Sequence, residues 1–68
     1  MERKIVSSSN IKSIGYLLGV LEIEFKNRTI YQYKNIPERV YKNLMSSSSK
    51  GTYFSEYIKE NYPYRKIK

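Results

Sequence analysis

The chain has 68 residues, 40% of them hydrophobic and 28% charged, which suits one small globular domain and leaves little room for a deep cleft. It contains no cysteine, histidine or aspartate, so disulfides, zinc fingers and catalysis by a cysteine or histidine side chain are excluded. The net charge is +7 and there are eight tyrosines. Basic side chains attract phosphates and aromatic rings stack on bases, but a lysine-rich surface over a tyrosine-rich core explains the same composition.

Residues 1–10 form a polar lead-in that ends in Ser7-Ser8-Ser9-Asn10, a sequence typical of turns. The start of the chain lacks the apolar core and cleavage site of a signal peptide, and no apolar run approaches the length of a membrane span. We therefore expect a cytoplasmic protein that has no contact with a membrane.

Three strand candidates follow, over residues 11–18, 20–26 and 29–34. The second is the clearest, because Leu21, Ile23 and Phe25 alternate with charged residues. This alternation predicts a strand with one buried and one solvated face, and hence an antiparallel sheet. In the first candidate, Gly15 weakens the strand pattern.

The loop between the second and third strands decides which way the tyrosines face. With a two-residue loop, Tyr31 and Tyr33 would share the face of the glutamates. With a three-residue loop, Phe25 lies opposite Thr29, and both tyrosines join the apolar face that includes Leu21. We favour the three-residue loop because it gives one continuous apolar face.

Two amphipathic helices are predicted after the strands. The first begins at Pro37, whose missing N–H suits a first turn, and its apolar residues recur at intervals of four up to Leu44. The second follows a run of four serines and spans about residues 50–61, with Phe54 in its apolar stripe. A basic tail, residues 64–68, completes the chain and is either a strand or loose.

Strands followed by helices predict an α+β fold, here a three-stranded antiparallel β-meander followed by two α-helices packed on one face. Residues 1–68 are expected to form a single domain. The apolar positions of the predicted strands and helices should meet in one core. The expected core residues are Leu21, Ile23, Phe25, Val40, Leu44, Phe54 and Ile58.

Several short motifs resemble the KTSC domain family, with the family's spacing along nearly the whole chain. They include Val6-Ser7-Ser8-Ser9-Asn10-Ile11, Ile14-Gly15-Tyr16, Tyr31-Gln32-Tyr33, Ile36-Pro37, Ser49-Lys50-Gly51-Thr52-Tyr53-Phe54 and Tyr62-Pro63-Tyr64. The family is named for its place at the C-terminus of some lysyl-tRNA synthetases, and its members also occur as stand-alone bacterial and phage proteins. The resemblance implies a small domain of unestablished function for which RNA binding has been suggested. Arg28 stands where members often carry glycine, a difference that concerns the turn geometry.

The first candidate site is Ser49-Lys50-Gly51, which leads into the second predicted helix. Free N–H groups and the helix dipole attract anions at such a position, and Lys50 adds a positive charge. A serine cap on an ordinary loop explains the same residues. The tail cations would extend the site if the tail folds back near this loop; they are Arg65, Lys66 and Lys68.

Aromatic side chains are the second candidate. Tyr31 and Tyr33 would stack on bases if both rings were exposed on the sheet, and Tyr53 is a further contact candidate. The favoured hairpin register instead places Tyr31 and Tyr33 against the core. In the other register, Glu22 and Glu24 would lie beside the rings and repel phosphates.

The residue inventory does not favour catalysis, since a general base would have to be Glu, Lys or Tyr. We therefore expect no enzymatic activity, no metal and no cofactor. Two binding functions remain open: a small module that contacts RNA phosphates without sequence choice, or a protein-interaction module that docks on a larger partner through a tyrosine-rich surface. Tyrosine is enriched at both kinds of site, so composition does not separate them.

Overall fold

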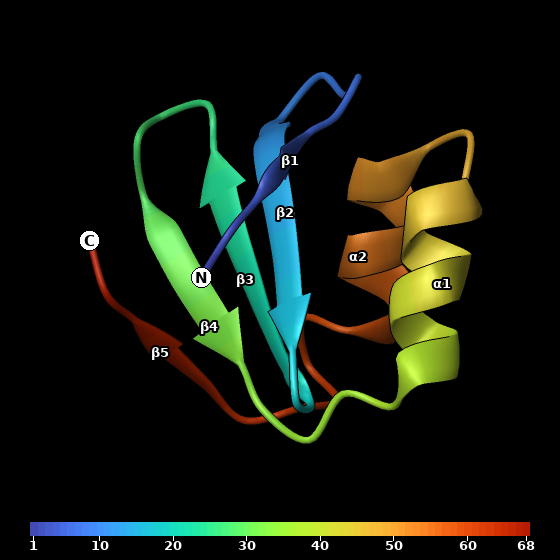
Figure 1. Ribbon diagram of the computed structural model, residues 1–68. Helices are drawn as coiled ribbons and strands as arrows, with labels where there is room; N and C mark the ends of the chain where they lie inside the picture. The colour runs from blue at the N-terminus through green and yellow to red at the C-terminus, as the bar shows by residue number, and fades with distance from the viewer.

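The computed structural model describes residues 1–68 as a five-stranded antiparallel sheet with two helices (Figure 1). The strands lie side by side in chain order: β1 Lys4–Ile5, β2 Ile11–Leu17, β3 Val20–Phe25, β4 Ile30–Tyr33 and β5 Tyr64–Lys66. The helices α1 (Glu38–Ser46) and α2 (Lys50–Tyr57) connect β4 to β5 and lie on one side of the sheet (Figure 1). The predicted α+β fold is confirmed.

The sheet has two more strands than the sequence predicts. The lead-in contributes β1, which pairs with β2, and the basic tail contributes β5, which pairs with β4. All residues of both added strands are exposed. A strand at a sheet edge with no buried face carries no apolar alternation, so the residue pattern does not indicate a strand in the lead-in and does not decide between a strand and a loose segment in the tail.

α2 begins at the predicted residue and α1 one residue later than predicted, and α2 is shorter than predicted. Pro37 is the cap residue just before α1, and α2 ends at Tyr57 instead of continuing to residue 61. Beyond this end, the side-chain amide of Asn61 donates to the backbone oxygen of Tyr57 at 3.0 Å. The N–H groups of Ile58 and Lys59 both bond to the oxygen of Phe54, which closes the last turn.

The β3–β4 hairpin has the predicted three-residue loop. Leu21 lies opposite Tyr33 and Ile23 opposite Tyr31, and the N–H of Phe25 bonds to the oxygen of Thr29 at 2.9 Å. Arg28 has a positive φ of 74°. That left-handed conformation favours glycine, which gives a physical reason for glycine at this loop position.

The core lies between the inner face of the sheet and the two helices. Six of the seven predicted core residues are buried, and the seventh, Phe25, is half-buried against them. Beside α1, the ring of Tyr16 stacks on Tyr41 at a centroid distance of 4.6 Å, and its hydroxyl donates to the oxygen of Ile36 at 2.6 Å. Further core residues are Ile11, Ile14, Tyr33 and Ile36.

The outer face of the sheet is not simply solvated, because the N-terminal segment crosses it (Figure 1). Glu22, expected to face water, is only 5% exposed. Gly15 allows this close approach: a Cβ atom there would lie 2.6 Å from the backbone oxygen of Glu2 and 3.0 Å from Cγ of Arg3. The lead-in is therefore part of the folded structure.

Candidate functional site

A groove of about 720 Å³ opens between α2 and the sheet, on the side of β3, β4 and β5. Aromatic rings make up nearly all of its hydrophobic lining, so we call it the aromatic groove. Six rings line it: Phe25, Tyr31, Tyr33, Phe54, Tyr62 and Tyr64. They come from three strands, α2 and the segment after α2, so the groove exists only in the complete fold.

Tyr33 and Phe54 form the floor of the aromatic groove. Their rings meet edge-on with centroids 5.2 Å apart, and Phe54 also meets Phe25 edge-on at 5.6 Å. Tyr33 is 4% exposed, and burial together with the neighbouring Tyr64 and Tyr31 raises the pKa of its hydroxyl to about 12. Tyr33 therefore supports the groove and offers no free face to a ligand.

Tyr64 is the exposed ring of the groove, and the half-buried Tyr31 lies beside it. Tyr31 is half-buried, Tyr64 is 60% exposed, and their centroids lie 5.8 Å apart. Tyr64 also contacts Tyr33, with a centroid distance of 5.5 Å. The favoured register is confirmed, because Tyr33 is buried against Phe54 of α2 and Tyr31 is half-buried on the same face. The exposed ring beside Tyr31 is Tyr64.

Tyr53 does not belong to the aromatic groove. Its ring packs on Tyr57, one turn further along α2, with centroids 4.7 Å apart, and neither residue lines the groove. Of the three tyrosines considered as contacts, the structure therefore brings Tyr31 and Tyr33 together and separates Tyr53 from them.

The rim of the aromatic groove is polar and carries more positive than negative charge. Lys26 and Lys59 line it together with one carboxylate, Glu60. The neutral donors and acceptors there include Asn10 and Asn27. Sequence patterns did not indicate this rim, because its members lie in loops and at the end of α2, where no periodicity marks them.

The loop that precedes α2 faces a second, wholly polar hollow of about 450 Å³, formed with residues 7–10. Lys50 Nζ donates to the backbone oxygen of Ser47 at 3.0 Å, and the hydroxyl of Ser49 donates to Thr52 Oγ1 at 2.8 Å. No side chain caps the backbone N–H groups at the start of α2. Gly51 borders both this hollow and the aromatic groove.

The structure does not bring the basic tail to this loop. β5 forms the sheet edge beyond β4, whereas the α1–α2 connection lies at the opposite side of the molecule (Figure 1). The hypothesis of one patch that joins Lys50 to the tail cations is therefore wrong. Within the tail, Lys66 lies opposite Tyr31 and Arg65 opposite Gln32, so the two side chains leave the sheet on different faces.

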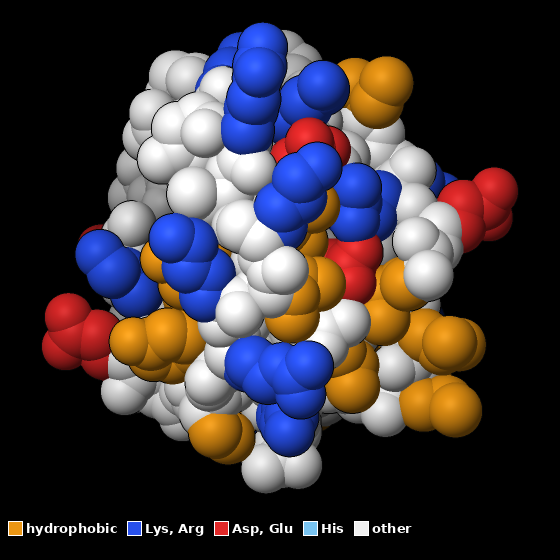
Figure 2. Space-filling view, turned by 90° about the vertical axis from the view of Figure 1, so that its left-hand side faces the viewer, with side chains coloured by type: hydrophobic (Ala, Val, Ile, Leu, Met, Phe, Trp, Pro, Cys, Tyr) orange, Lys and Arg blue, Asp and Glu red, His pale blue; other side chains and the backbone are white.

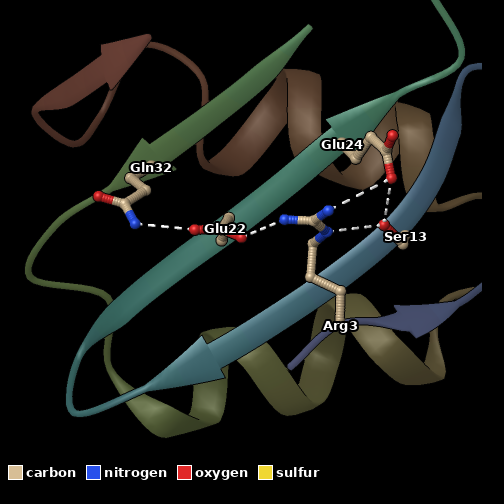
Figure 3. Close-up of polar contacts among 5 residues, drawn as sticks. All are labelled: Arg3, Ser13, Glu22, Glu24 and Gln32. Atoms are coloured by element: carbon tan, nitrogen blue, oxygen red, sulfur yellow. Dashed lines mark hydrogen bonds and ion pairs between the residues drawn. The ribbon is translucent and has the colours of Figure 1, made fainter. Parts of the chain in front are cut away.

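Five side chains form a polar network on the outer face of the sheet (Figure 3). Arg3 pairs with one carboxylate oxygen of Glu22, and Gln32 Nε2 donates to the other at 2.8 Å. Arg3 also donates from Nε to Ser13 Oγ at 3.0 Å, and Ser13 donates to Glu24 Oε1 at 3.0 Å. Burial opposes ionisation of Glu22, but the hydrogen bonds from Gln32 and Arg3 and the charge of Arg3 lower its pKa.

This network lies on the face of the sheet opposite the aromatic groove, because Glu22 and Glu24 alternate with the inward residues of β3. The alternative register, in which these glutamates would lie beside Tyr31 and Tyr33, is therefore not the one adopted. The structure contains no group of three or more acidic side chains that could hold a metal ion. Neither helix is long and apolar enough to cross a membrane.

A comparison of the sequence with known protein families identifies the family of this chain. The model of the KTSC domain matches residues 7–62. The chain belongs to the KTSC domain family. The matched span includes β2, β3, β4 and both helices and leaves out the edge strands β1 and β5.

Related proteins agree with this membership. The crystal structure of a KTSC domain protein from Yersinia pestis is 46% identical and superposes with a TM-score of 0.94, covering 98% of this chain and 97% of that one. An uncharacterized protein of Stutzerimonas stutzeri is 33% identical over 98% of this chain and 99% of its own length. A lysine–tRNA ligase from Nostoc is 36% identical over 47 residues, which cover 69% of this chain and 8% of the ligase.

Proposed function

We propose that this KTSC domain is a non-enzymatic accessory module that binds RNA mainly through phosphate contacts. The supporting observation is that most of its basic side chains form no salt bridge. Of the thirteen lysines and arginines, eleven form no salt bridge; the exceptions are Arg3, in the outer network, and Lys42, which pairs with Glu38 at 3.7 Å. Unpaired surface cations attract a phosphate backbone and release its counterions on binding.

The positive charge is spread over the side of the molecule that β4 and β5 form. Figure 2 shows Lys and Arg side chains across this face, among hydrophobic side chains and a smaller number of acidic ones. The tail supplies Arg65, Lys66 and Lys68 at this edge. The similarity to part of a lysine–tRNA ligase is a further reason to consider RNA as the partner.

Titration of single-stranded RNA with the full chain at two salt concentrations tests this proposal. Non-specific phosphate contacts give a Kd of about 10⁻⁴–10⁻⁶ M, and log K should fall with log salt with a slope of about −0.7 per neutralised phosphate. The pair Arg65→Glu/Lys66→Glu should weaken binding strongly. Lys50→Glu is tested separately, because Lys50 lies far from the tail, and it reports on the start of α2. Lys12→Glu, at an exposed position of β2, is the control.

A protein-interaction module is the second candidate, and the β2–β3 turn favours it. Leu18 is 91% exposed and has a positive φ of 50°, a conformation and an environment that both disfavour leucine. Its neighbour Leu17 is also exposed. Absence of RNA binding at low salt, together with a specific protein recovered from nuclease-treated extract that Leu18→Asn no longer captures, would replace the RNA proposal with this one.

A further inference from the structure

We propose that single-stranded RNA binds with its bases in the aromatic groove, stacked on Tyr31 and Tyr64, while its backbone follows the lysines of the rim. This inference rests on the proposed function and names its site. It moves the ligand away from the start of α2, where the sequence suggested an anion site, to the space between α2 and the β3–β5 half of the sheet.

The rings of Tyr31 and Tyr64 are held in fixed positions before any ligand arrives. Tyr64 lies opposite Tyr33 in the β4–β5 ladder, and Tyr31 lies opposite Lys66. Beneath them, Tyr33 contacts both rings, with centroid distances of 6.5 Å to Tyr31 and 5.5 Å to Tyr64. Rings that are already ordered lose little side-chain entropy when a base stacks on them, so the stacking free energy goes into binding.

Charge near the aromatic groove suits a phosphate backbone. Lys26 lies at the end of β3 and Lys59 just after α2, on the rim, and Lys66 leaves β5 on the same face as Tyr64. Only one acidic residue, Glu60, lines the groove. The carboxylates of Glu22 and Glu24 are on the other face and are already paired with Arg3.

The shape of the site favours a single strand over a duplex. Bases in a helix are stacked on one another and cannot present a free face to Tyr31 or Tyr64, whereas an unpaired strand can unstack and enter a groove. The aromatic lining provides stacking without a dense set of base-specific donors. We therefore expect tolerance of sequence, with a preference for unpaired RNA over double-stranded RNA.

The deciding experiment compares two tyrosines of similar exposure. Tyr64 is 60% exposed in the groove, and Tyr57 is 56% exposed on α2 outside it. In fluorescence-anisotropy titrations of a labelled oligouridylate with the full chain at low salt, Tyr64→Ala should weaken binding about tenfold, as expected for one lost stacking contact. Tyr57→Ala should change the Kd less than about twofold, and Tyr64→Phe should bind like wild type, since stacking needs only the ring.

Two outcomes separate this inference from the proposed function. If wild type binds with the expected salt dependence but Tyr64→Ala and Tyr57→Ala behave alike, the groove is not the site and the proposed function stands. If wild type shows no binding at low salt, both fail. Should Tyr64→Ala unfold, amide chemical shifts of wild type on RNA addition decide: changes at Tyr31, Lys59 and Tyr64 support the groove, and changes confined to α1 or the serine loop overturn it.

Discussion

Gln32 donates a hydrogen bond from its side-chain amide to Glu22 Oε1 at 2.8 Å, from β4 to β3, while Arg3 occupies the other oxygen of the same carboxylate. Glu22 thus has both oxygens satisfied although it is nearly buried. One partner comes from the sheet and the other from the N-terminal segment. The stability of the outer face therefore depends on a residue near the very start of the chain.

Arg3→Ala should destabilise the domain by about 3 kcal/mol, because it leaves a nearly buried carboxylate without its cation. Thermal unfolding followed by circular dichroism measures the loss, and Lys4→Ala, an exposed neighbour without a salt bridge, is the control. Adding Glu22→Gln to Arg3→Ala should recover part of the loss, since the amide carries no charge. Equal melting temperatures for Arg3→Ala and Lys4→Ala would show that the network contributes nothing.

The contact between Arg3 and Glu22 should also make the stability of the wild-type domain fall in acid. The folded-state pKa of Glu22 is lowered from 4.5, so its contribution is complete above pH 4.5 and is lost as the pH falls through the folded-state pKa. Denaturant unfolding between neutral pH and pH 3 should show a smaller decrease for Glu22→Gln than for wild type. Parallel curves for the two proteins would contradict the lowered pKa.

Phe54→Ala should cost about 3–5 kcal/mol, because the ring is buried and contacts Phe25 and Tyr33. A domain of this size has a total stability of similar magnitude, so the variant should be largely unfolded at room temperature. One-dimensional proton NMR reveals this directly through the loss of dispersed amide signals. Tyr57→Ala on the same helix should keep them, and a dispersed Phe54→Ala spectrum with unchanged melting would refute the packing of α2.

Arg28→Gly should stabilise the domain by about 0.5–1 kcal/mol. The residue has a φ of 74°, which is costly for any side chain with a Cβ, and glycine relieves this at a smaller entropic cost in the unfolded chain. Asn27→Gly is the contrasting variant, because Asn27 Oδ1 accepts bonds from the N–H and hydroxyl of Thr29. It should lower the melting temperature, and a lower value for Arg28→Gly as well would show that φ strain is not the dominant effect.

Tyr33 should make the fold sensitive to strong base. Because its pKa rises to about 12 on folding, its contribution is complete below the usual tyrosine value of 10 and is lost as the pH rises through 12. Between these values stability should fall by up to about 1.4 kcal/mol per pH unit from this group. Tyr33→Phe removes the ionisable hydroxyl, so its alkaline decrease should be smaller than that of wild type; an identical decrease would exclude Tyr33 as the source.

The parts of the fold that could be predicted share one property, a buried face that imposes a period on the residues. The alternation in β3 predicts the register of β4, because a slip by one residue would turn Tyr31 and Tyr33 away from the apolar face of Leu21 and Ile23 to the face of the glutamates. β5 has no such pattern, since Tyr64, Arg65 and Lys66 are all exposed. The sequence therefore does not show that the ring of Tyr64 lies beside Tyr31. The exposed part of the aromatic groove cannot be predicted for the same reason.

The outer network was missed for a different reason. Arg3 and Glu22 are nineteen residues apart in the sequence and meet only because the N-terminal segment crosses the sheet above Gly15. No local rule connects a cation in a lead-in with a carboxylate in a strand. The unexpected glycine in β2 was the one available signal, because a missing side chain inside a strand indicates that another part of the backbone comes close.

The two edge strands have a consequence for how copies of this protein behave at high concentration. An unpaired strand edge is a template onto which another chain can add, and that process starts fibrous aggregation. Here both edges are short, β1 with two residues and β5 with three, and they carry Lys4, Arg65 and Lys66. Two such edges from neighbouring molecules repel each other, and this repulsion opposes edge-to-edge pairing between copies of the chain.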